Sequence, residues 1–219
     1  MRPNSKSVSR NTIYTDILSR TDPDIIILTE TNSIINFGNK YFEASTTPLP
    51  KLHDGYPYKA GENRVTIFSK YPFTRQFETA DSYSSICVEI LTPFGQLIIY
   101  GTIIGFLGGI KDPFANDLEN QMADLSKIAK VGNICFAGDL NISFSGYPYP
   151  SHMIRKSITD VFDSLSLINL TAHVEDSVIH GVFSKSFLEN KKRVVTNTSF
   201  DKKITDHNLI NISIGEHSW

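Results

Sequence analysis

Residues 134–141 read Ile-Cys-Phe-Ala-Gly-Asp-Leu-Asn, an apolar run that ends in a carboxylate and an amide. A short apolar run with β-branched and aromatic residues, preceded here by Gly132 and Asn133, is typical of a strand buried on both faces. We therefore predict a strand over 133–137. Asp139 and Asn141 would follow it at the edge of the sheet, where the carboxyl ends of strands often carry binding sites.

Two further stretches repeat this pattern. The run Ile25–Leu28 is a second buried strand by the same criterion, and Thr29-Glu30-Thr31-Asn32 follows it. Ile204-Thr-Asp206-His207 precedes a third apolar run at 209–214. One acidic residue at a strand end is commonly a solvated loop carboxylate. Three in one chain, one of them followed by an asparagine and one by a histidine, favour a shared site.

Oxygen ligands of this kind suit a hard divalent cation. Mg²⁺ keeps several waters in its coordination shell, so one or two carboxylates suffice to hold it. Hydrolysis of a phosphate ester further needs a positioned water and groups that stabilise negative charge. Glu30, Asp139, Asn141, Asp206 and His207 supply both kinds of group. These residue types can therefore fill the roles that metal-dependent cleavage of a phosphate ester requires.

Helices and hairpins are mixed along the rest of the chain. Their order does not alternate strictly, as it would in a doubly wound parallel sheet, and it favours an α/β domain of two packed sheets with helices outside. Residues 39–63 are rich in turn formers and predict surface connections with one short strand. The predicted helices are Ser9–Arg20, a segment from Asp112-Pro113 to Gly132, and Ser151–Leu165; the other predicted strands are Val65–Ser69, Ser84–Leu91, Gln96–Ile104, Val178–Ser184 and Leu209–Ile214.

Length and composition fit one soluble domain over 1–219. With 40% hydrophobic and 20% charged residues, the chain can bury a sizeable core. The formal net charge of −2 neither supports nor excludes nucleic acid, so a field that attracts phosphate must be local. Cys87 and Cys135 lie in apolar runs, which predicts buried, unpaired thiols and argues against a secreted disulfide scaffold.

The sequence gives no sign of a membrane segment. Residues 1–7 carry positive charge without an apolar segment behind them, so they do not resemble a signal peptide. The longest apolar stretch, 97–110, is shorter than the ~20 residues of a membrane span and is interrupted by glycines. We expect a cytoplasmic protein without membrane contact.

Three of these motifs resemble a known family when they are taken together. Leu28-Thr-Glu30-Thr-Asn32, Gly138-Asp139-Leu-Asn141 and Thr205-Asp206-His207 are similar, in order and spacing, to the signature elements of the endonuclease/exonuclease/phosphatase superfamily. The stretch 64–72 resembles the family's strand that ends in Ser-Lys/Arg-Tyr-Pro, and 96–105 resembles its next core strand. The resemblance covers most of the chain. It implies a deoxyribonuclease-I-like, four-layer α/β/β/α sandwich.

The resemblance also implies roles for individual residues. Glu30 would bind a divalent metal, Mg²⁺ or Mn²⁺, and Asp206 would lie at the same metal site. Asp139 would orient or deprotonate the attacking water. Asn141 would hydrogen-bond the phosphate, and His207 would contact the scissile phosphate and stabilise its charge. The implied substrate is a phosphate ester, with DNA and RNA among the candidates, and the implied enzyme is a nuclease.

Arg64 and the basic runs have two interpretations each. Arg64 could contact a substrate phosphate, or it could form a salt bridge at the start of a strand. The runs Lys191–Arg193 and Lys202-Lys203 could form a positive rim that guides phosphate, although a solvated face is the usual role of such runs. Tyrosines in Gly/Pro-rich loops are usually surface or packing residues, but they could stack on bases if the loops border the site; these are Tyr56, Tyr58, Tyr147 and Tyr149.

The sequence departs from the family pattern at three places. The family begins with a strand that carries an asparagine near the metal, whereas this chain starts at Met1-Arg-Pro-Asn4, so we expect the first core strand to be missing. Ile179 stands where the family has the aspartate that orients the histidine, and Asp176 or Asp201 are the alternatives. The run 101–104 lacks the family's Thr-His pair. A catalytically impaired domain that binds nucleic acid or protein therefore stays open as the alternative function.

Overall fold

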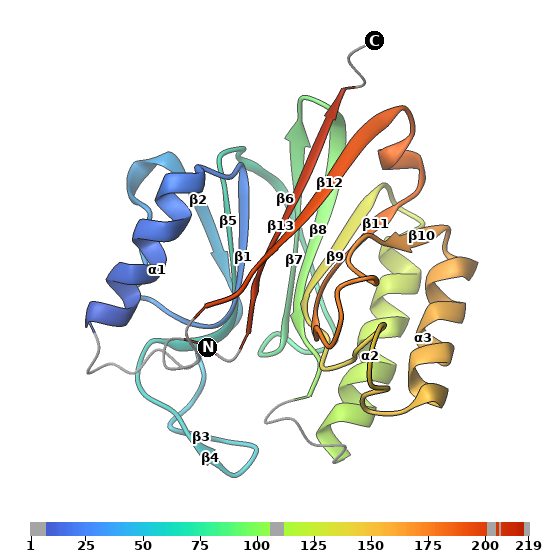
Figure 1. Cartoon of the computed structure of the whole chain (residues 1–219). Helices are drawn as coiled ribbons and strands as arrows, with labels where there is room; N and C mark the ends of the chain where they lie inside the picture. The colour runs from blue at the N-terminus through green and yellow to red at the C-terminus, as the bar shows by residue number, and fades with distance from the viewer. Residues whose placement is uncertain (1–7, 106–111, 201–204, 206, 217–219) are drawn as a thin grey trace.

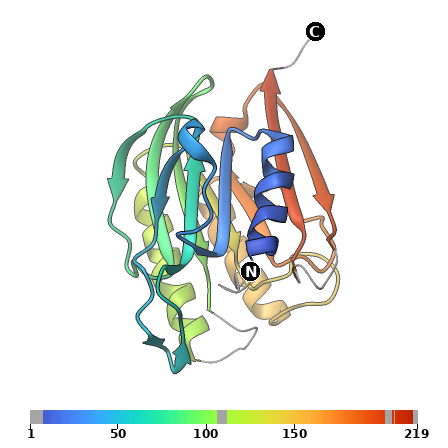
Figure 2. The same cartoon turned by 90° about the vertical axis from the view of Figure 1, so that its left-hand side faces the viewer.

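Four layers follow one another across the molecule in the computed structural model, which describes residues 8–105, 112–200, 205 and 207–216. Helix α1 (Val8–Thr21) covers a three-stranded sheet, and this sheet packs on a six-stranded sheet. Helices α2 (Asp112–Ile128) and α3 (His152–Ser164) cover the far side of the larger sheet (Figure 1). Figure 2 looks onto α1 and the smaller sheet behind it. The expected α/β/β/α layering is therefore present.

The smaller sheet is antiparallel, with the order β1 (Ile25–Asn32), β5 (Glu62–Ser69) and β2 (Phe42–Ser45). The larger sheet has one parallel pair, β8 with β9, and α2 supplies the crossover between them. The order in the larger sheet is β10 (Leu167–Asn169), β11 (Ile179–Ser184), β9 (Ile134–Asp139), β8 (Gly95–Ile103), β7 (Ser85–Thr92) and β6 (Phe73–Phe77).

Two small antiparallel pairs complete the strands. A hairpin of β3 (Leu52–His53) and β4 (Tyr56–Pro57) projects beyond the smaller sheet in Figure 1. The C-terminal ribbon of β12 (Lys191–Thr198) and β13 (Leu209–Glu216) runs across the larger sheet. Two single turns of 3-10 helix lie at 38–40 and 186–188.

A separate apolar core fills each of the three spaces between layers, which explains why the apolar runs became strands and amphipathic helices. Leu18 of α1 packs with Ile26 and Phe68 of the smaller sheet. Val65, Ile67, Ile99 and Ala137 belong to the core between the two sheets. The core under α2 and α3 contains Tyr100, Leu125, Ile134, Phe136, Ile158 and Phe162. Cys87 and Cys135 are free and buried as predicted, and burial raises the pKa of both thiols to about 12.

The sequence did not predict β6, β10 and β12. Strand β12 carries the basic run Lys191–Arg193, and most of its side chains are exposed, so no apolar pattern marks it. Its backbone nevertheless pairs with β13 along its whole length. Lys192 and Arg193 point to solvent, as expected for a solvated face, while the Lys191 ammonium lies 5.1 Å from the Phe187 ring centre.

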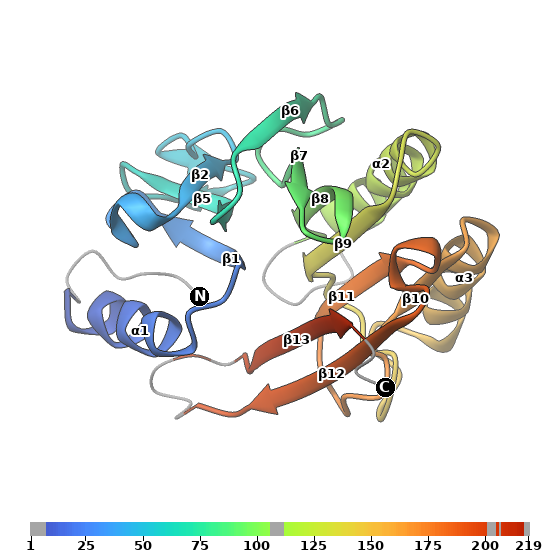
Figure 3. The ribbon, with the colours of Figure 1, turned by 90° about the horizontal axis from the view of Figure 1, so that it is seen from above.

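Two of the edge strands in the described part of the chain, β1 and β13, lie beside the candidate pocket. Strand β1 pairs only with β5, and β13 pairs only with β12. Residues of both strands line one pocket, and Figure 3 shows the two strands from above. The first described element is α1, so whether a strand precedes it falls outside the described residues. Among the described residues, no helix is long and apolar enough to cross a membrane.

Candidate active site

The fold brings three chain segments with polar tips to one end of the molecule. Strands β1 and β9 both run toward this end, and β13 starts there (Figure 1). Glu30 lies near the end of β1, Asp139 is the last residue of β9, and His207 precedes β13. The sequence predicted all three as site residues. Asp206, predicted to lie at the metal site, falls outside the described residues.

Asp139 is the centre of this group. Its side chain is buried, with the residue only 6% exposed, and its Oδ2 lies 3.5 Å from Nε2 of His207. Its Oδ1 accepts a hydrogen bond from the backbone N–H of Asn141 at 3.0 Å. Burial raises the pKa of Asp139, and the charge of Glu30 raises it further, against the opposing effects of His207 and the Asn141 N–H. Glu30 therefore lies close enough to Asp139 for the two charges to interact.

Strained backbone surrounds these side chains. Glu30 has φ 50° and Asn141 has φ 51°, both in the left-handed region that non-glycine residues rarely occupy. Gly138 has φ 143°, and a Cβ at this position would lie 1.9 Å from the carbonyl oxygen of Thr102. Such conformations cost of order 1–3 kcal/mol each and gather at functional sites. Here such conformations occur at Glu30 itself and close to Asp139 on either side, at Gly138 and Asn141.

A hydrogen bond from its side-chain amide holds Asn141 in place. Its Nδ2 donates to the carbonyl oxygen of Ile104 at 2.9 Å, which ties the turn after β9 to the end of β8. The neighbouring Ile104 N–H in turn donates to the Asp139 carbonyl oxygen at 2.9 Å. The side chain predicted to hydrogen-bond phosphate is thus fixed next to the buried carboxylate.

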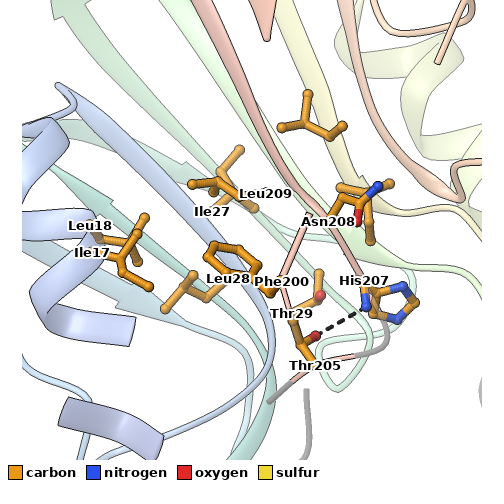
Figure 4. Close-up of a pocket in the computed structure, with 12 residues that line it drawn as sticks. Ile17, Leu18, Ile27, Leu28, Thr29, Phe200, Thr205, His207, Asn208 and Leu209 are labelled. Carbon is orange, nitrogen blue, oxygen red and sulfur yellow. Dashed lines mark hydrogen bonds between the residues drawn. The ribbon is translucent and has the colours of Figure 1, made fainter. Parts of the chain in front are cut away.

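The His207 imidazole contacts Asp139. Ile179, at the position where the resemblance would place the aspartate that orients the histidine, is apolar. Ile179 pairs with Asp139 in the β11–β9 register and lines the same pocket as His207. Asp176, one alternative partner, instead accepts a hydrogen bond from the Tyr147 N–H at 3.0 Å, and Asp201 falls outside the described residues. The His207 N–H donates to Thr205 Oγ1 at 3.1 Å (Figure 4), which fixes the backbone before β13.

Arg64 forms an ion pair, as one of its two interpretations proposed. The residue is 4% exposed, and Nη2 lies 2.9 Å from Oδ2 of Asp54, between β3 and β4. The same Asp54 oxygen lies 3.3 Å from Nε2 of His53. Arg64 therefore anchors the β3–β4 hairpin to the smaller sheet. Burial raises the pKa of Asp117, and the charge of Arg64 offsets part of that rise.

Two polar residues beside Glu30 were not predicted as site residues. Thr31 and Asn32 are 2% and 7% exposed, and Thr31 Oγ1 and Asn32 Nδ2 have no hydrogen-bond partner among the described residues. A buried polar group without a partner costs about 1–3 kcal/mol, so such atoms point to a ligand or solvent partner. The signal in the sequence was their place at the end of an apolar strand, directly after Glu30.

His180 was assigned no role from sequence, yet it holds the turn that follows Asn141. Its Nε2–H donates to the carbonyl oxygens of Ile142 and Ser177, at 2.9 and 3.0 Å. Because both partners can only accept, Nδ1 is the acceptor, and it lies 2.8 Å from Thr171 Oγ1. Burial lowers the pKa of His180 to about 4, so the imidazole is neutral at physiological pH.

An apolar pocket adjoins the site and is lined by residues of both β1 and β13. It has a cavity volume of about 120 Å³, below the ~300–1,000 Å³ of pockets that enclose a drug-sized ligand. Figure 4 shows apolar side chains of α1 and β1 on one side and Thr205, His207 and Asn208 on the other. His207 lies at the boundary between this pocket and the polar group around Asp139. In the described ranges, no cluster of three His, Cys, Asp or Glu side chains could hold a metal.

Comparisons with known proteins identify the architecture. No family model and no curated protein sequence matches the chain. An endonuclease/exonuclease/phosphatase from Beutenbergia cavernae DSM 12333 superposes with a TM-score of 0.67 at 13% identity, over 95% of this chain and 66% of that one. The endonuclease domain of TRAS1, a telomere-specific non-LTR retrotransposon, gives 0.68 at 12% identity, over 98% and 94%. The chain thus spans about two thirds of the Beutenbergia protein and nearly all of the TRAS1 domain.

A third similar structure contains nucleic acid. A single-site variant of the 3' phosphatase NExo from Neisseria, bound to a product DNA hairpin, gives a TM-score of 0.67 at 14% identity, over 97% of this chain and 95% of that one. Identities this low show the fold alone. The predicted four-layer, deoxyribonuclease-I-like sandwich is confirmed by these superpositions.

Proposed function

From the endonuclease/exonuclease/phosphatase fold of this chain, we propose that the protein is a divalent-metal-dependent phosphoesterase, and specifically a nuclease that hydrolyses phosphodiester bonds. The observation that carries the proposal is the environment of Asp139. One buried carboxylate contacts the His207 imidazole and interacts with the charge of Glu30, and these residues come from three distant segments. The fold itself is that of nucleases and phosphatases.

The chemistry of the donor set fits a hard divalent cation. The charges of Glu30 and Asp139 interact, and a cation held at Glu30 would relieve their mutual repulsion. One or two carboxylate ligands suffice for Mg²⁺ or Mn²⁺. The hydroxyl of Thr31 adds a buried oxygen without a partner in the described part of the chain. Glu30 would hold the metal, with Asp206 as the second ligand in our proposal. The bound cation would stabilise negative charge on the phosphoryl group.

The residues of this chain would then divide the remaining work. Asp139, whose pKa is raised by burial, is a stronger base than an exposed aspartate and would orient or deprotonate the attacking water. The amide of Asn141, fixed on the Ile104 carbonyl, would hydrogen-bond a phosphate oxygen. His207 would contact the scissile phosphate and stabilise the charge that develops there.

Nucleic acid is the proposed substrate. One similar structure is an endonuclease domain of a retrotransposon, and another is a 3' phosphatase bound to a product DNA hairpin. The net charge of −2 means that any attraction of the phosphate backbone must come from local groups. We propose that the cation at Glu30 provides much of that local positive charge, with no part for Arg64, because Asp54 already pairs with it.

The test is hydrolysis of single-stranded DNA, duplex DNA, RNA and a generic phosphodiester, with Mg²⁺, Mn²⁺ or a chelator. Asp139→Asn should lower the rate by about 10²- to 10⁴-fold, the usual contribution of a general base. Asp160→Asn is the matched control, because Asp160 is an exposed carboxylate on α3 that pairs only with Lys156 among the described residues. Hydrolysis that continues unchanged in Asp139→Asn, or in chelator, would overturn the assignment.

A second candidate function is a catalytically impaired domain that binds nucleic acid or protein. The observation that favours it is Ile179, an apolar residue beside His207 at the position of the family's orienting aspartate. This candidate predicts no metal-dependent turnover by the natural chain with any of the four substrates. Ile179→Asp would then be the variant in which turnover appears, whereas turnover by the natural chain would exclude the candidate.

A further inference from the structure

The loop between β9 and α3 presents the most exposed aromatic ring near the site. Tyr147 is 77% exposed, whereas most large apolar side chains in the described ranges are buried or half-buried. Single exposed apolar side chains are ordinary on protein surfaces and by themselves indicate nothing. Tyr147 differs from that ordinary case in two respects. Hydrogen bonds hold its backbone, and its loop begins and ends beside the candidate active site.

The backbone of Tyr147 is fixed on both sides. Its N–H donates to Oδ1 of Asp176 at 3.0 Å, and its carbonyl oxygen accepts from Nη2 of Arg155 at 3.1 Å and from the Ser143 hydroxyl. Gly146, before it, has φ 68°, and a Cβ there would lie 2.3 Å from the same Asp176 oxygen. The loop is thus tied down by side chains, while the ring that it carries adds little to the buried core.

Ser143 also closes the loop upon itself. The Ser143 N–H donates to the Tyr149 carbonyl oxygen at 2.8 Å, and the Tyr149 N–H donates to Ser143 Oγ at 3.0 Å. The Arg155 guanidinium reaches the same hydroxyl at 3.0 Å. These hydrogen bonds therefore close residues 143–149 into a compact loop. Tyr147 lies within this closed loop, so its backbone conformation is set before any ligand arrives.

The loop begins and ends beside the candidate active site. It leaves the site two residues after Asn141, whose turn His180 holds through the Ile142 carbonyl. It returns at Tyr149, where burial and the charge of Asp139 both raise the pKa of the phenol. Both ends of the loop are therefore near the buried carboxylate, and the loop carries the exposed Tyr147 ring between them.

We propose that Tyr147 stacks on a base of the nucleic acid strand whose phosphate lies at Asp139 and Asn141. The proposal rests on the proposed function, because it assumes a nucleic acid substrate. An aromatic ring on a fixed backbone gains stacking energy with any base, since every base has a flat face, and loses little conformational freedom. Such a contact needs an unpaired base. It therefore assigns a single-stranded or terminal nucleotide to the side of the site that this loop borders.

Binding in chelator tests the stacking contact without requiring turnover. Fluorescence anisotropy would measure the affinity for a short labelled oligothymidylate at low ionic strength. Tyr147→Ala should weaken binding by about 5- to 150-fold, the range found for loss of one stacked base, while Tyr147→Trp and Tyr147→Phe should retain it. Leu91→Ala is the control, because Leu91 is 64% exposed near the end of β7, at the end of the sheet opposite Asp139.

A base-free oligomer separates stacking from contacts with phosphate. The matched ligand carries the same phosphates with tetrahydrofuran in place of every nucleoside, so its charge is unchanged. Tyr147→Ala should leave the affinity for this oligomer unaltered, and the natural protein should bind it as weakly as the variant binds oligothymidylate. The losses of affinity caused by Tyr147→Ala and by removal of the bases should therefore not add, which is the signature of a direct contact.

The outcomes distinguish the two proposals. Hydrolysis that requires metal and Asp139, together with equal oligothymidylate binding by Tyr147→Ala and the natural protein, would overturn the stacking proposal alone. Binding that depends on Tyr147 and on bases, without hydrolysis under any metal, would support stacking and overturn the proposed enzyme. If the natural protein binds oligothymidylate no more tightly than the base-free oligomer, or if Tyr147→Ala weakens binding of the base-free oligomer equally, the stacking contact is wrong.

Discussion

The carboxylate of Asp139 is buried beside one imidazole and within the field of a second carboxylate. Burial is the main reason that its pKa is raised, so the folded protein holds the neutral form more readily than the unfolded chain does. A carboxyl group with a raised pKa destabilises the folded state above its unfolded pKa, because ionisation must then occur in the buried site. In the absence of a cation, Asp139 therefore lowers stability at neutral pH.

Asp139→Asn should consequently raise the melting temperature of the metal-free protein at neutral pH while it removes hydrolysis. About 1 kcal/mol corresponds to roughly 2–4 °C in a chain of this size, so a shift of a few degrees is expected. Differential scanning calorimetry in chelator would measure it, and the difference should shrink in acid, where the natural carboxyl group is already neutral. A variant that melts lower at neutral pH would mean that the contact with His207 outweighs the effect of burial.

His180 gives a pH dependence of the opposite sign. Its pKa falls from 6.5 in the unfolded chain to about 4 in the fold, so between these values the unfolded chain binds the proton and the folded one does not. Stability should therefore fall as the pH drops from 6.5 to 4, by on the order of 3 kcal/mol. Urea unfolding of the natural protein and of His180→Gln would measure this, because the variant should lose that part of the slope. Equal slopes would contradict the account of the buried imidazole.

Among the elements, β8 and β9 leave no room for a side chain at Gly138, the residue before the last residue of β9, Asp139. Gly138→Ala would place a Cβ 1.9 Å from the Thr102 carbonyl oxygen in a left-handed conformation. We expect a loss of at least about 2–3 kcal/mol in the free energy of unfolding, from strain and displaced strand pairing. Gly215→Ala is the control, because its Cβ would meet nothing within 4 Å. A chemical denaturation series would contradict this expectation if the two variants were equally stable.

Which elements the sequence could predict depends on where their stability comes from. Strands such as β1 and β9 are stabilised by burial of their own side chains, so an apolar run marks them. Strand β12 is stabilised by its backbone pairing with β13, while its side chains are mostly exposed, and such a strand has no pattern of its own. The same holds for β6, whose Thr74, Arg75 and Gln76 face solvent. Tertiary pairing decides these elements.

The candidate site shows the same division. Glu30, Asp139 and His207 could be found because each stands next to an apolar strand in a spacing that resembles a family. The anchoring of the β3–β4 hairpin by Arg64, and the support of the turn after Asn141 by His180, could not be found. Both depend on partners that are 10 or 38 residues away in the chain, and no local pattern encodes such pairs.

At the scale of the whole molecule, the smaller sheet and the C-terminal ribbon are separate units whose edge strands β1 and β13 line one pocket. Backbone N–H groups on the open side of β1 and β13 lack strand partners in the described part of the chain. We expect alternate amides along each of these strands to exchange with solvent far faster than their paired neighbours. Hydrogen exchange followed by NMR would test this, with the fully paired strand β9 as the internal reference. Uniform protection along β1 would show that another segment covers its edge.

The ribbon of β12 and β13 reaches the body of the molecule mainly through side chains, such as Ile212, which packs over Gly181. Contacts of this kind resist a pulling force much less than a continuous hydrogen-bonded sheet does. Under tension applied at the C-terminus, the ribbon should peel away as a first, weak step, while the layers around β8 and β9 remain folded. His207 would leave with it, so mechanical load would detach the imidazole from Asp139 long before the protein unravels.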